Sequence, residues 1–237
     1  MFLQGIPETM PDEHYRPINI HGILNLSFFI AFAAILIILG VSFLLRVKKQ
    51  EDEAAKRIKI AFGLFGVLYG ICRIFFILMF QDFTNPAQNY DLFANIAYSF
   101  GMLGLTSIIW AIEKVKYETR YFFLTGLAIT IITTAGIVLN LLGMAVIREL
   151  ILIIIMSGTP VAGFFIIILY IQVIRLSSGE VRKKALYSLI GFLIMVVGIT
   201  MDGQFFLAIE TIPIWFKMDV VPLFCIVGYL MFAINQL

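Results

Sequence analysis

Charged side chains are scarce in this chain. Only 14% of its 237 residues are Asp, Glu, Lys or Arg, and 61% are hydrophobic, whereas a soluble domain usually carries about 25% charged residues. A protein of this composition would expose large apolar patches in water and would aggregate. The composition therefore argues against a water-soluble domain and favours a bilayer as the solvent.

Side chains that commonly carry out chemistry are also rare. The sequence contains two cysteines and two histidines. Cys72 and Cys225 lie within apolar segments, which favours buried thiols over a disulfide, and His14 and His21 lie near the N-terminus. The sequence contains no P-loop, no H-E-x-x-H, no G-x-S-x-G and no Cys/His cluster. We therefore expect no enzymatic activity, no metal site and no cofactor.

Long apolar segments dominate the sequence instead. A helix needs about 20 apolar residues to cross a ~30 Å hydrocarbon layer at ~1.5 Å per residue. Seven such segments follow one another, with the pair Arg148-Glu149 dividing the fourth from the fifth. They predict an all-α bundle of seven transmembrane helices over residues 23–46, 58–81, 92–113, 121–145, 149–174, 184–209 and 213–236. Residues 1–22 read as a polar tail, and residues 23–237 as one membrane domain, so any output module is expected on another chain.

Basic residues predict how these helices are oriented. Lys and Arg are retained in cytoplasmic loops. Thirteen of the 17 basic residues lie in the first, third and fifth connections: Arg46, Lys48, Lys49, Lys56, Arg57 and Lys59; Lys114, Lys116 and Arg120; Arg175, Arg182, Lys183 and Lys184. Seven crossings place these connections on one side. We therefore expect the N-terminus outside and the C-terminus in the cytoplasm.

Small residues at helical spacing predict where helices approach closely. Gly66 and Gly70 form a G-x-x-x-G pair, Ala97 and Gly101 have the same spacing, and Gly191 and Gly198 lie one heptad apart. In lipid, helices associate through close packing, which small residues permit. These positions are therefore expected at helix–helix contacts inside the bundle.

Polar residues within the apolar segments lie on one side of the membrane. Counted from the cytoplasmic helix ends, Arg73 is about 20 Å deep and Asp202 and Asp219 are about 26 Å deep. A charge at such depth costs at least ~2.5–3.5 kcal/mol, so it normally faces other helices, a partner or water. We expect an outward-facing, ligand-binding pocket formed by Arg73, Asn95, Tyr98, Asn140, Asp202 and Asp219.

Arg73 is central to this expectation. It shares a helix face with Gly66 and Tyr69, so its side chain should point into the bundle. We expect an ion pair between Arg73 and a carboxylate, with Asp219 slightly preferred over Asp202. The same pair could simply lock the packing of the helices, or line a path for ions or protons.

The chain resembles the seven-helix input domains of prokaryotic membrane sensors, including those fused to histidine kinases. The resemblance rests on Arg73-Ile74-Phe75-Phe76, on Ile112-Glu113-Lys114 and on Thr119-Arg120-Tyr121. It covers most of the chain, without a fused output domain before Leu237. The resemblance implies a sensor that binds a small molecule from outside and signals through a separate protein.

Three functions are therefore open. The first is a multi-pass sensor or receptor in the cell membrane, with an extracellular small-molecule ligand and a cytoplasmic or membrane protein partner. The second is a transporter of small solutes or ions, and the third is a structural subunit of a larger membrane assembly. All three involve the lipid bilayer, and none involves nucleic acid.

Overall fold

The computed structural model describes residues 20–80, 86–116, 120–142, 145–202, 209, 211–213, 215–234 and 236. This part of the chain is helical and has no strands. Its helices are α1 (Ile20–Arg46), η1 (Val47–Lys49), α2 (Glu53–Phe80), α3 (Pro86–Lys116), α4 (Tyr121–Leu141), α5 (Ala145–Leu176), α6 (Gly179–Met201), η2 (Phe216–Val220) and α8 (Val221–Ile234). The described residues thus contain the seven α-helices that the sequence predicts.

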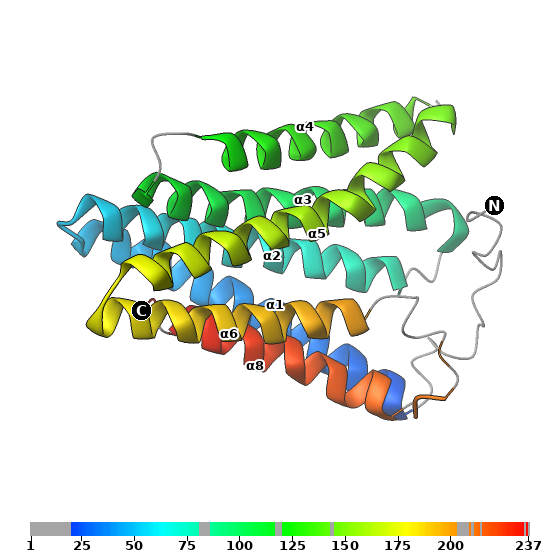
Figure 1. Cartoon of the computed structure of the whole chain (residues 1–237). Coiled ribbons are helices and arrows are strands. Elements are labelled where there is room, and N and C mark those ends of the chain that lie inside the picture. The colour runs from blue at the N-terminus through cyan, green and yellow to red at the C-terminus, as the bar shows by residue number, and fades with distance from the viewer. Residues whose placement is uncertain are drawn as a thin grey trace.

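The helices form a ring in chain order. Each α-helix from α1 to α6 packs against the next one, α6 packs against α8, and α8 closes the ring against α1. A further contact, between α3 and α5, crosses the ring. The α1–α2 and α5–α6 turns lie at the same end of the bundle, where α3 ends and α4 begins (Figure 1).

Five helices are long and apolar enough to cross a membrane. In the described residues these segments are Ile23–Lys49, Glu53–Leu78, Phe93–Glu113, Ser157–Leu176 and Gly179–Met201. The apolar parts of the other two helices, Tyr121–Gly136 and Val221–Ile234, are shorter. Length and composition therefore support five of the seven predicted crossings directly.

Two of the described helices differ from the predicted segments in a way that bears on the site. The sixth segment was expected to continue to residue 209, but α6 ends at Met201, and Asp202 is its C-cap, with its backbone N–H bonded to the Gly198 carbonyl. The seventh segment was expected over 213–236 with a bend at Pro222, and the structure begins it with the π-helical turn η2, directly before Val221 and Pro222. Pro222 has no N–H to give the carbonyl of Met218, so a regular α-helical bond is impossible there.

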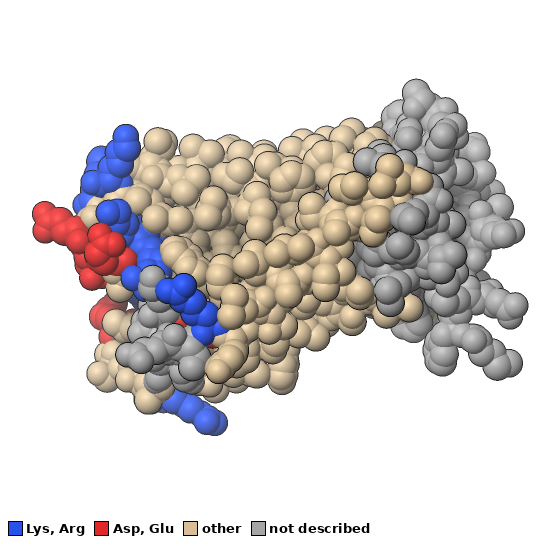
Figure 2. Space-filling model, turned by 90° about the horizontal axis from the view of Figure 1, so that it is seen from above, with Lys and Arg blue, Asp and Glu red and all other residues tan. Residues whose placement is uncertain are grey.

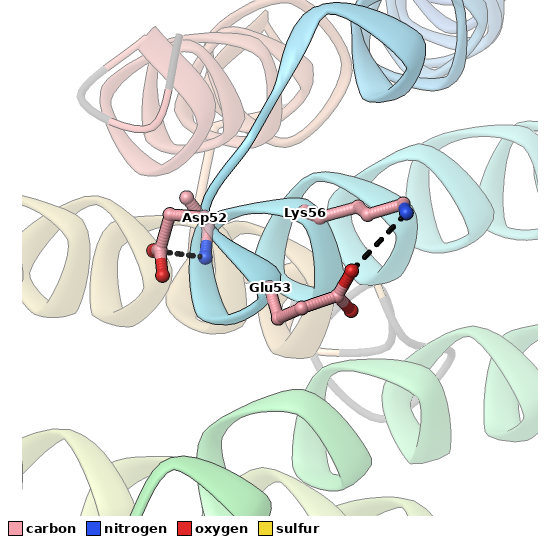
Figure 3. A network of polar contacts seen from close by, with 4 residues as sticks. Asp52, Glu53 and Lys56 are labelled. Carbon is pink, nitrogen blue, oxygen red and sulfur yellow. Dashed lines mark hydrogen bonds and ion pairs between the residues drawn. The ribbon is translucent and has the colours of Figure 1, made fainter.

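The polar turn between α1 and α2 is organised by its acidic residues (Figure 3). The Asp52 carboxylate accepts a 2.9 Å hydrogen bond from the backbone N–H of Ala55, which caps the start of α2. Glu53 follows in the first turn and forms a 3.3 Å ion pair with Lys56. Asp52 and Glu53, the acidic residues of this otherwise basic loop, thus lie at the N-terminus of α2, where negative charge is favourable.

Among the described residues, surface charge gathers at one end of the bundle. In the space-filling view, Lys, Arg, Asp and Glu gather at the end that carries the α1–α2 and α5–α6 turns, and a broad uncharged belt follows (Figure 2). The belt is covered by apolar side chains such as Ile38, Leu124, Ile131, Phe164 and Val197, each exposed. A belt of this kind suits contact with lipid.

Glycine allows two helix pairs to touch through their backbones. A Cβ atom at Gly40 would lie 2.7 Å from the backbone nitrogen of Val67, and one at Gly66 would lie 2.6 Å from the carbonyl oxygen of Leu36. These contacts join α1 to α2. The sequence-based prediction that Gly66 and Gly70 lie at a close helix contact is confirmed, since Gly70 faces the same helix.

The second such pair is α6 with α8. A Cβ atom at Gly191 would lie 2.4 Å from the backbone nitrogen of Phe232, and one at Gly198 would lie 2.8 Å from that of Cys225. Gly228 on α8 approaches the backbone of Met195 equally closely, at 2.3 Å. The predicted packing role of Gly191 and Gly198 is therefore confirmed.

Candidate functional site

Arg73 lies inside the bundle, as its position on the Gly66–Tyr69 face predicts. It is only 4% exposed. Its Cζ atom lies within 5.3–5.8 Å of the centroids of four aromatic rings, which belong to Phe29, Phe32, Tyr69 and Phe76. Contacts between a guanidinium and aromatic faces are favourable, by about 2 kcal/mol or more when the groups are desolvated. The rings therefore offset part of the cost of burying this charge.

Asp202 supplies the opposite charge. Its Oδ2 atom accepts a 3.0 Å hydrogen bond from Nη1 of Arg73. The carboxylate stands at the C-cap of α6, where the helix ends and the side chain can reach towards α2. The side chain of Asp202 is 21% exposed, against 5% for that of Arg73. The pair thus has a buried cationic side and a more accessible acidic side.

The slight preference for Asp219 as the partner of Arg73 is corrected by this contact. Asp219 lies in η2, which packs against α1 and α8. The prediction measured depth along straight helices and could not include the π-helical turn. The end of α6 at Met201 instead places Asp202 opposite Arg73.

The other predicted site residues are arranged around this pair less directly. Tyr98 on α3 is half-buried and packs edge-on against Phe76, with 5.2 Å between ring centroids, and Phe76 in turn faces Arg73. Asn95 is buried, and its backbone carbonyl accepts a 2.9 Å hydrogen bond from the Ser99 hydroxyl. The side chain of Asn140 lies outside the described residues. The structure thus joins Arg73 to Asp202 directly and to Tyr98 through one ring.

Two polar atoms near this cluster are buried without a hydrogen-bond partner in the described part of the chain. They are Nε of Arg73 and the hydroxyl of Tyr229. Tyr229 on α8 is fully buried and packs against Phe32 and Phe65, with centroids 6.3 Å and 6.1 Å away. A buried unsatisfied polar group costs about 1–3 kcal/mol. The region between α2 and α8 therefore contains two buried polar atoms to which the described residues give no hydrogen bond.

Several residues around Arg73 were not predicted from the sequence. Phe29 and Phe32 lie three residues apart, which places both on the face of α1 that meets Arg73. Cys225 was expected only to be a buried thiol, and its sulfur lies 4.0 Å from Nη2 of Arg73. The only available signal was a helical face shared by aromatic residues, which is common in apolar helices.

A second buried charge lies at the charged end of the bundle. Glu113, near the end of α3, is 2% exposed. Its two carboxylate oxygens accept hydrogen bonds from the backbone N–H groups of Phe122 (3.2 Å) and Phe123 (2.8 Å). Those groups belong to the first turn of α4, where helical N–H groups lack internal partners and a negative charge is favoured. Glu113 therefore caps a neighbouring helix.

A polar contact also holds the end of α8 to α6. Ser188 is fully buried, and its hydroxyl donates a 3.2 Å hydrogen bond to the carbonyl oxygen of Phe232. The side-chain amide of Gln236 donates a 2.8 Å hydrogen bond to the same hydroxyl. This contact satisfies groups at a helix end and explains the buried serine without a ligand.

The fold and these buried groups define the class of protein. The five long apolar helices, the uncharged belt and the charged end fit a multi-pass α-helical membrane protein. Searches with models of protein families, among curated proteins and among solved structures found no match for the chain. The buried Arg73–Asp202 pair is therefore interpreted from its own chemistry.

Proposed function

We propose that the chain is a sensor or receptor in the cell membrane, which binds a small molecule at its outer end and signals through a separate protein. The proposed site has the Arg73–Asp202 pair as its floor, with Tyr98 at its side. The proposal includes an orientation in which the turns rich in Lys and Arg face the cytoplasm, because such residues are retained on that side of a membrane.

One observation carries this proposal. The side chain of Asp202 is 21% exposed at the end of α6 that lies away from the charged turns. Ionisable groups within membrane segments are costly and commonly mark functional sites. A polar ligand entering from this end would meet Asp202 before it met the enclosed Arg73, and any change in the ion pair would affect α2 and α6 together.

Ligand-induced thermal stabilisation tests the proposal. The purified protein is melted in detergent with a panel of amino acids, amines, carboxylates and sugars. We expect at least one class to raise the Tm of the wild type and to lose this effect in Arg73→Ala and Asp202→Asn. The matched control is Glu113→Gln, which neutralises a buried carboxylate at the opposite end and should keep the response. The proposal fails if no compound stabilises the wild type, or if the stabilisation persists in both site variants.

The four rings around Arg73 also support a second candidate function. They enclose the guanidinium so closely that the pair could serve only to lock α2, α6 and α8 together. A structural subunit of a larger membrane assembly would need such a lock and no ligand. It predicts a stoichiometric protein partner that purifies with the chain in mild detergent, together with no Tm response to the panel.

A further inference from the structure

The contacts between helices divide this side of the ring into two units. The backbones of α1 and α2 touch at Gly40, Gly63 and Gly66, and those of α6 and α8 touch at Gly191 and Gly228. Close packing of this kind, backbone against backbone, makes each pair rigid, because no side chain can rearrange to let the helices slide. We call the boundary between the α1/α2 pair and the α6/α8 pair the seam.

Where α2 faces α8, the contacts across the seam are of a different kind, because side chains make them. Between α2 and α8 the rings of Phe62 and Phe65 pack against Phe232, with centroids 4.8 Å and 5.8 Å apart. The close approach of Gly66 to α8 involves the hydroxyl of Tyr229. Aromatic side chains can change rotamer, so the seam is better able to separate than either glycine-packed pair.

The ion pair lies at the outer end of this seam. Arg73 belongs to the first unit and Asp202 to the second, and Nη2 of Arg73 also approaches Cys225 of the second unit. The unpartnered Nε of Arg73 and the unpartnered hydroxyl of Tyr229 lie at the same boundary. A boundary with unsatisfied polar groups gains hydration when it opens, which lowers the cost of opening.

We propose that the Arg73–Asp202 pair is a latch, which holds the outer end of the seam closed and whose release lets the α6/α8 pair move away from the α1/α2 pair. Loss of the carboxylate charge removes the attraction across the seam and leaves the guanidinium without its counter-ion. The guanidinium then gains by meeting water, which it can reach by opening the outer end. The latch goes beyond the proposed receptor function, because it requires no ligand.

The chain carries its own probes for this motion. Its only cysteines, Cys72 and Cys225, are both buried. Cys225 lies at the seam beside Arg73. Cys72 lies within the first unit, where its sulfur would be 3.2 Å from a Cβ atom on Gly101 of α3. Opening of the seam would expose Cys225 and leave Cys72 covered, whereas general loosening of the bundle would expose both.

The experiment compares the rates at which a hydrophilic maleimide labels the two thiols in the purified, full-length protein, read by peptide mass spectrometry. We expect Asp202→Asn to label at Cys225 about tenfold faster than the wild type, with Cys72 unchanged; tenfold corresponds to ~1.4 kcal/mol in the opening equilibrium. The double variant Asp202→Asn with Cys225→Ala should show only the slow labelling of Cys72.

Glu113→Gln is the matched control, since it neutralises a buried carboxylate that lies away from the seam. Any loosening that it causes is general, so it should not raise the rate at Cys225 relative to the rate at Cys72. Three results would overturn the latch: unchanged labelling of Cys225 in Asp202→Asn, equal acceleration at Cys72 and Cys225 in that variant, or the same preferential acceleration at Cys225 in Glu113→Gln. None of these results depends on a ligand, so the latch and the receptor proposal fail separately.

Discussion

Two buried charges in this bundle, Arg73 and Glu113, are compensated by local chemistry of different kinds. Arg73 has one carboxylate and four aromatic rings, and Glu113 has two backbone N–H groups at the start of a helix. Both arrangements follow the rule that a charged group is buried only when it is paired or hydrogen-bonded. A substitution that keeps the shape of either side chain but removes its charge should therefore still lower stability.

Substitution of Glu113 tests its capping role. Glu113→Gln keeps the shape but removes the charge and replaces one acceptor oxygen with an NH₂ group that faces a backbone N–H. We expect a loss of about 1–2 kcal/mol in stability, because a charged cap and one hydrogen bond are lost together. The change is measured by denaturation in detergent.

Glu53→Gln is the control for this prediction. Glu53 also stands at the start of a helix, but its side chain is 77% exposed and forms a surface ion pair with Lys56. Its loss should cost less than about 0.5 kcal/mol. Equal effects of the two substitutions would contradict the capping role of Glu113.

The turn before α6 depends on a single glycine. Gly179 has φ +58°, the left-handed region that other residues enter at a cost of about 1–2 kcal/mol. A Cβ atom there would meet nothing within 4 Å, so any effect of substitution comes from the backbone alone. We expect Gly179→Ala to lower stability by about 1 kcal/mol, measured by the shift in the denaturation midpoint, and Gly179→Asn to lose less.

At the scale of helices, Gly228 on α8 has the least room for a side chain of the described glycines, because it faces α6. A Cβ atom at Gly228 would lie 2.3 Å from the backbone nitrogen of Met195, so Gly228→Ala must push the two helices apart. We expect a loss of about 1–3 kcal/mol or more, the usual cost of overpacking, measured as a fall in Tm.

Gly163 on α5 provides the matched substitution. A Cβ atom there would meet nothing within 4 Å, so Gly163→Ala should leave the Tm unchanged or raise it slightly, because alanine favours helix. A similar fall in Tm for both variants would show that backbone contact does not set the stability of the α6/α8 pair.

Helix number and helix contacts could be predicted because they depend on local signals. Apolar length predicts a helix, and the spacing of Gly66 and Gly70 or of Gly191 and Gly198 predicts a packed face. Pro222 predicts a distortion of the seventh helix but not the π-helical turn η2, and the end of α6 at Met201 has no comparable local signal. The end of α6 at Met201 places Asp202, rather than Asp219, opposite Arg73.

The candidate site could be predicted only in part, because some of its features follow from local signals and others do not. The inward direction of Arg73 follows from helical periodicity, and it is confirmed. The choice between Asp202 and Asp219 depends on the arrangement of helices far apart in the sequence, which depth along single helices does not determine. The cap formed by Glu113 depends likewise on the way α4 returns over the end of α3.

At the scale of the whole molecule, the distribution of basic residues predicts the orientation. In a background with Cys72→Ala and Cys225→Ala, a single cysteine is introduced either as Glu51→Cys, in the turn after α1, or as Thr211→Cys, between α6 and η2. Both positions are exposed. In intact cells, we expect an impermeant maleimide to label Thr211→Cys at once and Glu51→Cys only after permeabilisation. The reverse pattern would overturn the proposed orientation.

The long separation between Arg73 and Asp202 has a consequence for biosynthesis. The two residues are 129 positions apart. At about 5–20 residues per second, the ribosome takes ~6–26 s to add the acid after the arginine. During that time the second helix must be held in or near the membrane with an uncompensated positive charge, shielded only by the rings of α1 and α2. A nascent chain arrested before Asp202 should therefore remain loosely inserted, and full-length synthesis completes its anchoring.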